Sequence, residues 1–340
     1  MIPEYINDWL TIIETMSNQN TYKLAWGRSI IEYVNLNEID DSKEYFEFKL
    51  IDAAEIVLKY YWNQLFFFDL KQVPEKGKAK IISEVQSLID LYKKLTNSDY
   101  PKWFQDGKDV LKDRKEYSKA LKNIAYLLKV NPTKYFLQAS VNGSNKKETV
   151  PVYIRDDENN RILIKKEDAY LLKEYGIIIA KLLNFKWTQL LEKYNFVPML
   201  SNKVTAISNG KIDRNNLTKY KNQLIKEFTD GKIIDFYTGE ELSYSEATVD
   251  HVIPWSFMYS DDIWNLVLTS KSNNSSKSNV VPSEEVINRL KERNENIKDV
   301  VDEIYKKDLM LAEINNSVDK YYYECKVSRW HITKIMLKII

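Results

Sequence analysis

The spacing of apolar residues predicts a largely helical first part of the chain. Up to about residue 140, apolar side chains mostly recur at helical intervals, as they do at Trp9, Ile12 and Met16. Residues 44–71 form a dense apolar and aromatic segment, and we predict that it is a helix in the centre of a core. A platform on which nucleic-acid bases stack is the alternative interpretation of these aromatic side chains.

Beyond residue 140 the pattern predicts a mixture of strands and helices. Apolar and polar residues alternate over 150–154 and 161–164, and the polar residues 156–160 between them predict a hairpin turn. Further predicted elements are a loop at 142–145, a helix over 167–195, a linker over 201–209, a helix over 217–228, strands over 233–237, 247–252 and 265–269, a short helix over 270–278, and charged helices from 284 to about 323 and after Ser328.

Composition narrows the class of protein. With 44% hydrophobic and 29% charged residues, the 340-residue chain can bury a sizeable core, and its length predicts about two domains. No apolar run is long enough to span a bilayer, and the N-terminus lacks the pattern of a signal peptide. The single cysteine, Cys325, excludes an internal disulfide and any multi-cysteine zinc site. We therefore expect a cytoplasmic protein that does not associate with membranes.

The net charge is only +1, whereas a protein that merely coats DNA is usually clearly basic. Any contact with nucleic acid must therefore come from a local patch of positive charge.

Candidate chemistry surrounds one of the two histidines. Asp250 and His251 lie in one predicted strand, Asn265 opens the next strand, and Asn274 and Lys277 lie on the short helix that follows. Hydrolysis of a phosphodiester needs a base for the attacking water, stabilisation of charge on the phosphate, and nearly in-line geometry. Imidazole is suited to the first task because it exchanges protons near neutral pH. Asp250 and Asn274 offer two oxygen atoms of the kind that Mg²⁺ prefers.

The spacing of these residues also suggests how they would cooperate. Strand alternation directs Asp250 and His251 to opposite sides, so one can face a metal ion while the other approaches the scissile phosphate from another direction. Asn265 could bind the loop backbone and fix the direction of His251. Lys277 shares a helical face with Asn274 and could hold a phosphate, and an ordinary surface lysine is the alternative.

Four stretches around these residues resemble the HNH nuclease family, whose domain has the ββα-metal fold. The stretches are Tyr237–Leu242, Val249–Pro254, Asp261–Leu268 and Asn274–Ser283, and the last is similar to the HNH domain of RNA-guided CRISPR nucleases.

This resemblance implies an assignment of roles. Asp250 and Asn274 would bind one Mg²⁺ or Mn²⁺ ion, His251 would be the general base, and Asn265 would orient it. The expected fold class is α+β, with a mostly helical N-terminal region followed by a C-terminal ββα-metal domain. The expected parts are a helical domain at 1–140, a mixed hairpin-plus-helix segment at 141–230 packed on it, the HNH domain at 231–295, and C-terminal helices at 296–340.

The chain departs from many HNH proteins at the positions of a structural zinc site. Those relatives carry two Cys-x-x-Cys pairs, whereas the corresponding residues here are Asp235, Thr238, Ser270 and Asn273. We therefore expect no structural zinc and a domain held by hydrophobic packing alone. The residues that we assign to this packing are Phe236, Trp255, Phe257 and Trp264.

Asn20–Trp26 and Lys59–Gln64 resemble the helical region of stand-alone bacterial HNH proteins, which are often associated with restriction or phage defence. We therefore predict a metal-dependent endonuclease that cuts DNA, with the helical region recognising a target or a partner. A single HNH domain cuts one strand at a time, so double-strand cleavage would need a dimer. The expected partners are DNA and either a second copy of the chain in a homodimer or a defence-system partner protein. Two alternatives stay open: a catalytically inactive nucleic-acid-binding subunit of a defence complex, and an effector nuclease activated by a signal or partner. The second histidine, His331, is predicted to be structural.

Overall fold

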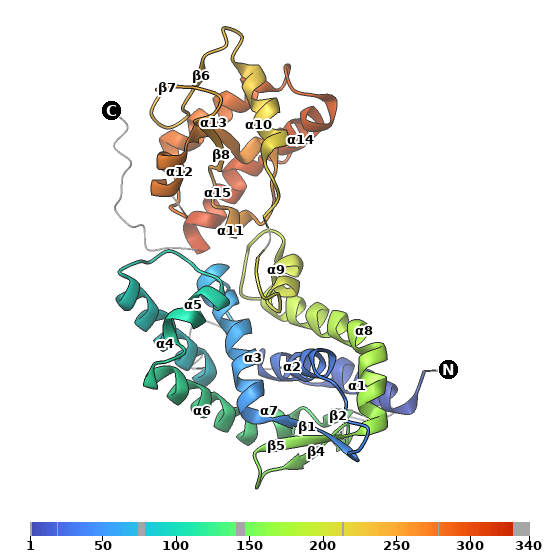
Figure 1. Ribbon diagram of the computed structural model, residues 1–340. Coiled ribbons are helices and arrows are strands. Elements are labelled where there is room, and N and C mark those ends of the chain that lie inside the picture. Colours follow the sequence, from blue (N-terminus) through green and yellow to red (C-terminus); the bar gives the residue numbers. More distant parts are fainter. Residues whose placement is uncertain are drawn as a thin grey trace. The chain divides into compact units, whose positions relative to one another are not determined.

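The chain divides into two units, which are built around separate parts of the sequence (Figure 1). The first unit comprises Met1–Asn195 and Leu200–Ile212, and the second comprises Phe196–Met199 and Asp213–Ile340. The computed structural model describes residues 2–18, 20–73, 79–140, 147–212, 214–277 and 279–328. The loop predicted at 142–145, the helix predicted after Ser328 and His331 lie outside these described residues.

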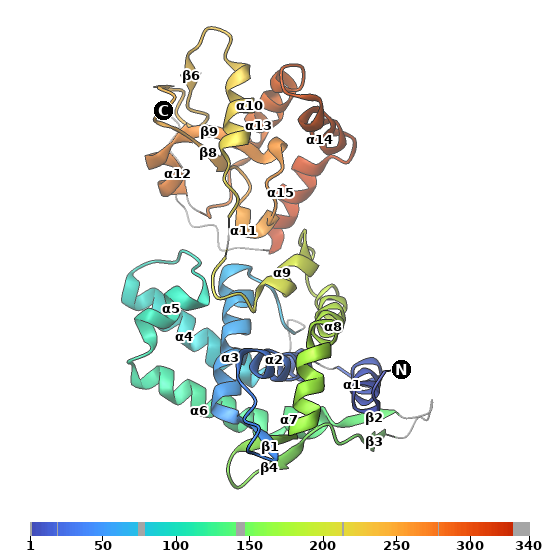
Figure 2. The same cartoon turned by 45° about the vertical axis from the view of Figure 1, so that its right-hand side comes forward.

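The first unit is mainly helical, as the apolar spacing predicts. Its longest helix, α8 (Lys166–Leu191), packs against α1, α2 and α9, and a short sheet closes the end near α7 (Figures 1 and 2). This sheet is antiparallel with the strand order β1-β5-β4. The remaining elements of this unit are α1 (Glu4–Thr15), α2 (Tyr22–Leu36), β1 (Tyr45–Lys49), α3 (Leu50–Trp62), α4 (Lys80–Thr96), α5 (Phe104–Leu111), α6 (Lys115–Val130), α7 (Pro132–Tyr135), β2 (Gln138–Ser140), β3 (Lys147–Thr149), β4 (Ile154–Asp156), β5 (Arg161–Lys165) and α9 (Leu200–Ala206).

The aromatic segment 44–71 differs from the single helix that we predicted. It begins as strand β1, whose alternation of buried and less buried residues matches pairing with β5, and it ends as a π-helix at Asn63–Phe67. The prediction that the segment lies in the core is confirmed. Tyr60 and Tyr61 are fully buried and Trp62 is 1% exposed, so these rings are not available to stack on bases.

Two shorter predictions in this unit need correction. The residues 201–209, predicted as a linker, contain helix α9, whose Val204 is fully buried. The strand predicted at 150–154 does not form over those residues, because strand β3 ends before them and β4 begins only at Ile154. Val150, Val152 and Tyr153 are buried in the irregular connection between these two strands. The hairpin turn between β4 and β5 is confirmed.

The second unit holds the short strands and the helices that follow them. Its apolar core joins β8, β9 and the helices after residue 284, with Phe257, Val267, Ile287 and Leu290 among its buried members. The charged segment after residue 284 forms separate helices α13, α14 and α15. The elements are α10 (Thr218–Leu224), β6 (Ile233–Ile234), β7 (Glu241–Leu242), β8 (Ala247–His251), α11 (Trp255–Met258), a 3-10 turn (Ile263–Asn265), β9 (Leu266–Ser270), α12 (Lys271–Lys277), α13 (Glu284–Ile297), α14 (Glu303–Ile314) and α15 (Ser317–Ser328).

The predicted α+β class is confirmed, with a helical N-terminal region and small antiparallel sheets. None of the described helices is long and apolar enough to cross a membrane.

Candidate active site

The candidate residues converge on one two-stranded sheet and the helix beside it. Strands β8 and β9 pair antiparallel, with Asp250 opposite Val267 and His251 opposite Leu266, and α12 contacts both strands (Figure 2). The alternation of β8 gives Asp250 and His251 different neighbours, as the next contacts show.

Asp250 is 6% exposed and lies among polar partners. Its Oδ2 accepts a hydrogen bond of 2.7 Å from the Tyr237 hydroxyl, and the Lys277 ammonium lies 3.1 Å from the same oxygen. Burial, together with the charge of Asp250, raises the pKa of Tyr237 well above its usual range. Tyr237 therefore stays protonated and donates to the carboxylate throughout the neutral range.

Lys277 lies where neither sequence-based interpretation placed it. It is 3% exposed, and its Nζ donates a hydrogen bond of 2.6 Å to the backbone carbonyl of His251 in addition to pairing with Asp250. A phosphate contact requires an accessible ammonium, and a surface lysine would be solvated. In this structure Lys277 instead balances the buried charge of Asp250 and ties α12 to the end of β8.

His251 forms a dyad with Asp261. The Nε2 atom of His251 lies 2.9 Å from Oδ1 of Asp261. The same carboxylate accepts hydrogen bonds from Trp255 Nε1 at 3.1 Å and from Asn215 Nδ2 at 2.7 Å. Burial alone would raise the pKa of Asp261, but these hydrogen bonds outweigh burial and hold it below its usual value.

The dyad determines which ring nitrogen of His251 is available. An ionised carboxylate only accepts hydrogen bonds, so Nε2 carries a proton and donates it to Asp261. Nδ1 forms no hydrogen bond with a described residue and is left as the basic nitrogen. The sequence analysis assigned no role to Asp261. The sequence feature that could have indicated Asp261 is its position in the connection between β8 and β9. Because these strands pair antiparallel, the connection begins and ends next to His251.

Asn265 is fully buried and fastens the chain that follows His251. Its side chain accepts a hydrogen bond of 2.8 Å from the Ile253 N–H and donates one of 2.9 Å to the Ile253 carbonyl. This two-way bond holds the backbone two residues after His251 in place.

Asn274 lies on α12 beside β8, where its Nδ2 donates to the Val249 carbonyl at 3.3 Å. With the amide nitrogen engaged in this bond, the Asn274 Oδ1 is the atom left for a ligand, and the Asp250 Oδ1 accepts no hydrogen bond from a described residue. These two hard oxygen donors fit Mg²⁺, which is often bound by one or two protein side chains together with substrate phosphates and water. No cluster of three or more His, Cys, Asp or Glu side chains suited to a metal occurs among the described residues.

A buried carboxylate occupies the region where many HNH relatives carry structural zinc. Asp235 is fully buried. Its Oδ1 accepts hydrogen bonds from the Tyr237 and Thr238 N–H groups, and its Oδ2 accepts from the Ser270 N–H, the Thr269 hydroxyl and Asn273 Nδ2, over 2.8 to 3.2 Å. All four positions that we matched to zinc-binding cysteines therefore meet in one network. The expectation that hydrophobic packing alone holds this domain was wrong.

The aromatic residues that we assigned to hydrophobic packing do lie in the core of this unit. Trp255, Phe257 and Trp264 are all at most 8% exposed, and Phe236 packs partly buried against the same core.

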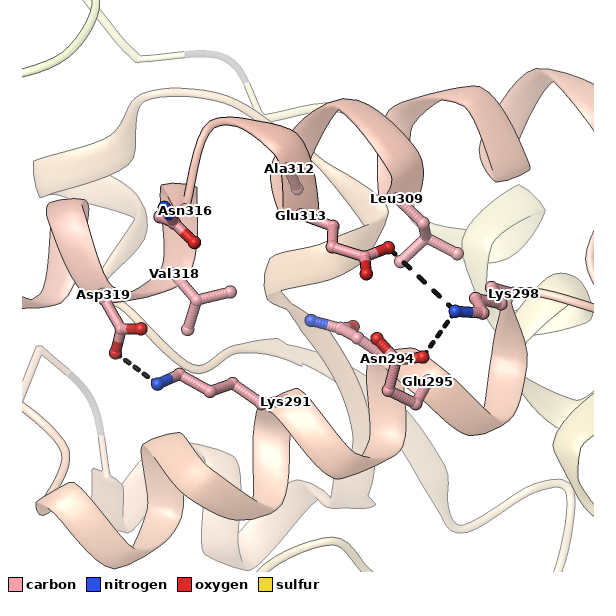
Figure 3. A pocket seen from close by; sticks show the side chains of 10 residues that line it. All are labelled: Lys291, Asn294, Glu295, Lys298, Leu309, Ala312, Glu313, Asn316, Val318 and Asp319. Atoms are coloured by element: carbon pink, nitrogen blue, oxygen red, sulfur yellow. Dashed lines mark hydrogen bonds and ion pairs between the residues drawn. The ribbon is translucent and has the colours of Figure 1, made fainter.

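A separate cavity in this unit, of about 160 Å³, lies among α13, α14 and the start of α15 (Figure 3). Figure 3 shows that its charged lining residues are paired with one another, Lys291 with Asp319 and Lys298 with Glu295 and Glu313. None of the candidate catalytic residues lines it, and it offers no unpaired charge to a phosphate.

Comparison with known proteins assigns both parts of the chain. The profile of DUF8808, a domain of unknown function, matches residues 7–206, which are more than half of the chain. The chain belongs to this family. An HNH endonuclease profile matches residues 235–283, the stretch that contains Asp235, Asp250, His251, Asn265 and Asn274. This DUF8808 member therefore carries an HNH endonuclease domain in its second unit, and the predicted resemblance is confirmed.

The curated relatives are similar over a short stretch. The CRISPR-associated endonuclease Cas9 of Streptococcus mutans serotype c is 45% identical over 60 residues, which are 17% of this chain and 4% of that protein. The Cas9 of Listeria innocua serovar 6a is 40% identical over 60 residues, with the same shares. The matched stretch thus spans only a small part of these relatives. No solved structure matches the chain.

Proposed function

We propose that this DUF8808 protein is a metal-dependent endonuclease that hydrolyses phosphodiester bonds in DNA. The observation that carries the proposal is the His251–Asp261 dyad, which leaves the other imidazole nitrogen without a hydrogen bond to a described residue. Asp250 precedes His251 on β8, and Asn274 lies on α12, which contacts that strand. A histidine and two hard oxygen donors on one strand-and-helix unit are the groups that phosphodiester hydrolysis requires.

The proposed roles follow from the contacts. Asp261 holds Nε2–H of His251, so that Nδ1 accepts the proton of the attacking water. Asn265 fixes the Ile253 backbone and thereby the direction of the chain after His251. Asp250 and Asn274 would hold a Mg²⁺ or Mn²⁺ ion, which would stabilise the charge that develops on the phosphate and the leaving oxygen. Lys277 and Tyr237 hold the Asp250 carboxylate in position through an ion pair and a hydrogen bond.

The biological setting is part of the same proposal. We assign the protein to restriction or phage defence in the cytoplasm, with the first unit recognising a DNA target or a partner protein. The resemblance of Asn20–Trp26 and Lys59–Gln64 to stand-alone defence nucleases supports this assignment.

The test is cleavage of supercoiled plasmid by the purified full chain with Mg²⁺, with Mn²⁺ and with EDTA. We expect nicking that needs the divalent ion and that falls by about 10²–10⁴-fold in His251→Ala, because a positioned general base contributes about that much. Lys271→Ala changes an exposed lysine on α12 and serves as the matched control, which should keep the wild-type rate.

The outcomes separate the alternatives. Binding of DNA without cleavage under every condition would contradict the proposal and favour a nucleic-acid-binding subunit. Cleavage that appears only with a cell extract or modified DNA would favour an effector switched on by a partner or signal. Equal rates in His251→Ala and the wild type would exclude this site as the source of the activity.

A further inference from the structure

The long helix α8 of the first unit has apolar residues on its outer face as well as its inner one. Its inner face packs against α1, α2 and α9. On its outer face, Ile177, Ile178 and Phe185 are 67, 63 and 56% exposed, and Tyr170 is 44% exposed. Single exposed apolar side chains are common on proteins, but several on one face of one helix indicate a surface that packs against something.

The part of this outer face that we call the α8 stripe consists of the six exposed residues between positions 170 and 185. At 100° per residue they fall within an arc of about 100°. The members are Tyr170, Glu174, Ile177, Ile178, Lys181 and Phe185.

The chemistry of the stripe is complementary to itself in reverse order. Ile177 and Ile178 flank its midpoint, Glu174 and Lys181 lie at equal distances on either side, and Tyr170 and Phe185 lie at equal distances farther out. If two copies pack antiparallel about this midpoint, isoleucine meets isoleucine, glutamate meets lysine, and tyrosine meets phenylalanine. A parallel pair would instead place like charges opposite each other.

We propose that the α8 stripe is an isologous interface at which a second copy of this chain packs antiparallel. Such a contact is closed by a two-fold axis and uses the same surface on both partners. The stripe runs for about 22 Å along the helix, and its apolar centre with a flanking charged pair is the arrangement of a small specific interface. This dimer goes beyond the proposed nuclease activity and does not depend on it.

The oligomeric state of the full chain tests the interface, measured by sedimentation or light scattering over a range of concentrations. The wild type is expected to dimerise, and Ile177→Asp is expected to weaken the dimer by about 100-fold, because it places a carboxylate at the axis. Ile304→Asp is the matched control, since Ile304 is 68% exposed on α14 and lies outside the stripe. Circular dichroism should show that both variants stay folded.

Charge exchange tests the antiparallel register. Glu174→Lys alone and Lys181→Glu alone each create like-charge pairs and should weaken self-association by about tenfold, whereas the two variants mixed together should associate. The double variant with both changes should dimerise like the wild type. In a parallel arrangement the single variants would instead associate as the wild type does, because each keeps the same two like-charge pairs.

Three results would overturn the proposal. The first is a wild type that stays monomeric at about 100 μM. The second is a dimer that Ile177→Asp leaves intact. The third is a double variant that remains as weak as the single ones. Each is independent of whether the protein cuts DNA.

Discussion

At the scale of single residues, the contact between His251 and Asp261 is the one that most affects the proposed chemistry. Three groups donate to the Asp261 carboxylate, namely His251, Trp255 and Asn215. Their geometry keeps the carboxylate in one position, and it therefore fixes both the tautomer and the plane of the imidazole.

We predict that Asp261→Asn lowers the single-turnover cleavage rate by about 100-fold and leaves the DNA concentration for half-maximal rate nearly unchanged. The amide matches the carboxylate in shape but can donate to Nε2 and so favours the wrong tautomer. Asp262→Asn is the control, because Asp262 accepts from Ser260 and makes no hydrogen bond to His251. A wild-type rate in a folded Asp261→Asn protein would show that the dyad does not orient the base.

The sequence named candidate residues but did not show the contacts that they make. Asp250, His251, Asn265 and Asn274 could be named because strand alternation and the resemblance to HNH nucleases fix their order along the chain. Lys277 was predicted to hold a phosphate, with a surface lysine as the alternative, because lysine is mostly exposed in proteins. Only the tertiary structure brings its ammonium to Asp250 and the His251 carbonyl. Asp261 has no recognisable spacing from His251, since an irregular connection sets their approach.

At the scale of elements, Asp235 joins several short pieces of the nuclease domain. It lies just after β6, and it bonds the turn at Tyr237 and Thr238, the end of β9 and the start of α12. Strands as short as β6 and β7 are not stable alone. The buried hydrogen bonds of Asp235 connect these elements at the positions where many relatives have a structural zinc site.

We predict that Asp235→Asn lowers the free energy of unfolding of this unit by about 2–4 kcal/mol at pH 7, because a charged acceptor of five hydrogen bonds is lost. Burial would raise the pKa of Asp235, yet the hydrogen bonds hold it below its usual value. A depressed folded-state pKa contributes stability above the unfolded value of about 3.9, and this contribution is lost as the pH falls through the folded value. The difference between wild type and variant should therefore shrink below about pH 4.

Chemical denaturation at several pH values measures this difference. Asp230→Asn serves as the control, because Asp230 is exposed and accepts a single backbone hydrogen bond. EDTA should leave the unfolding curve of the wild type unchanged. Loss of stability in EDTA comparable to that in Asp235→Asn would point to a bound structural metal instead.

Elements were predicted well where the apolar period was long and poorly where tertiary packing decided. The period-2 alternation of β1 is only five residues long and merges with the helix α3 that follows it, so the pattern was interpreted as one helix. Helix α9 was missed because its polar composition suggests a linker, whereas contact with α8 buries it.

At the scale of the whole molecule, the two units differ in how much of their function can be inferred from the sequence. The nuclease domain has a motif whose chemistry can be followed residue by residue. The DUF8808 unit has an apolar core and a self-complementary outer helix face, and neither is a chemical motif. Apolar spacing could predict its helices, but it could not show which face of α8 stays exposed, because both faces of that helix are apolar.

If both proposals hold, dimerisation should control the kind of cut. Each chain has one His251–Asp261 dyad, so a monomer breaks one phosphodiester at a time and produces nicked circles. Two chains joined through the α8 stripe bring two active sites to the same DNA, which allows breaks in both strands.

We predict that Ile177→Asp lowers the yield of linear plasmid by about tenfold, in line with its loss of dimer, while the nicking rate per chain stays the same. Ile304→Asp should change neither product. Gel analysis over a range of protein concentrations measures both, since linear product should rise more steeply with concentration than nicked product. A variant that stays monomeric yet forms linear plasmid at the wild-type rate would separate double-strand cleavage from the α8 interface.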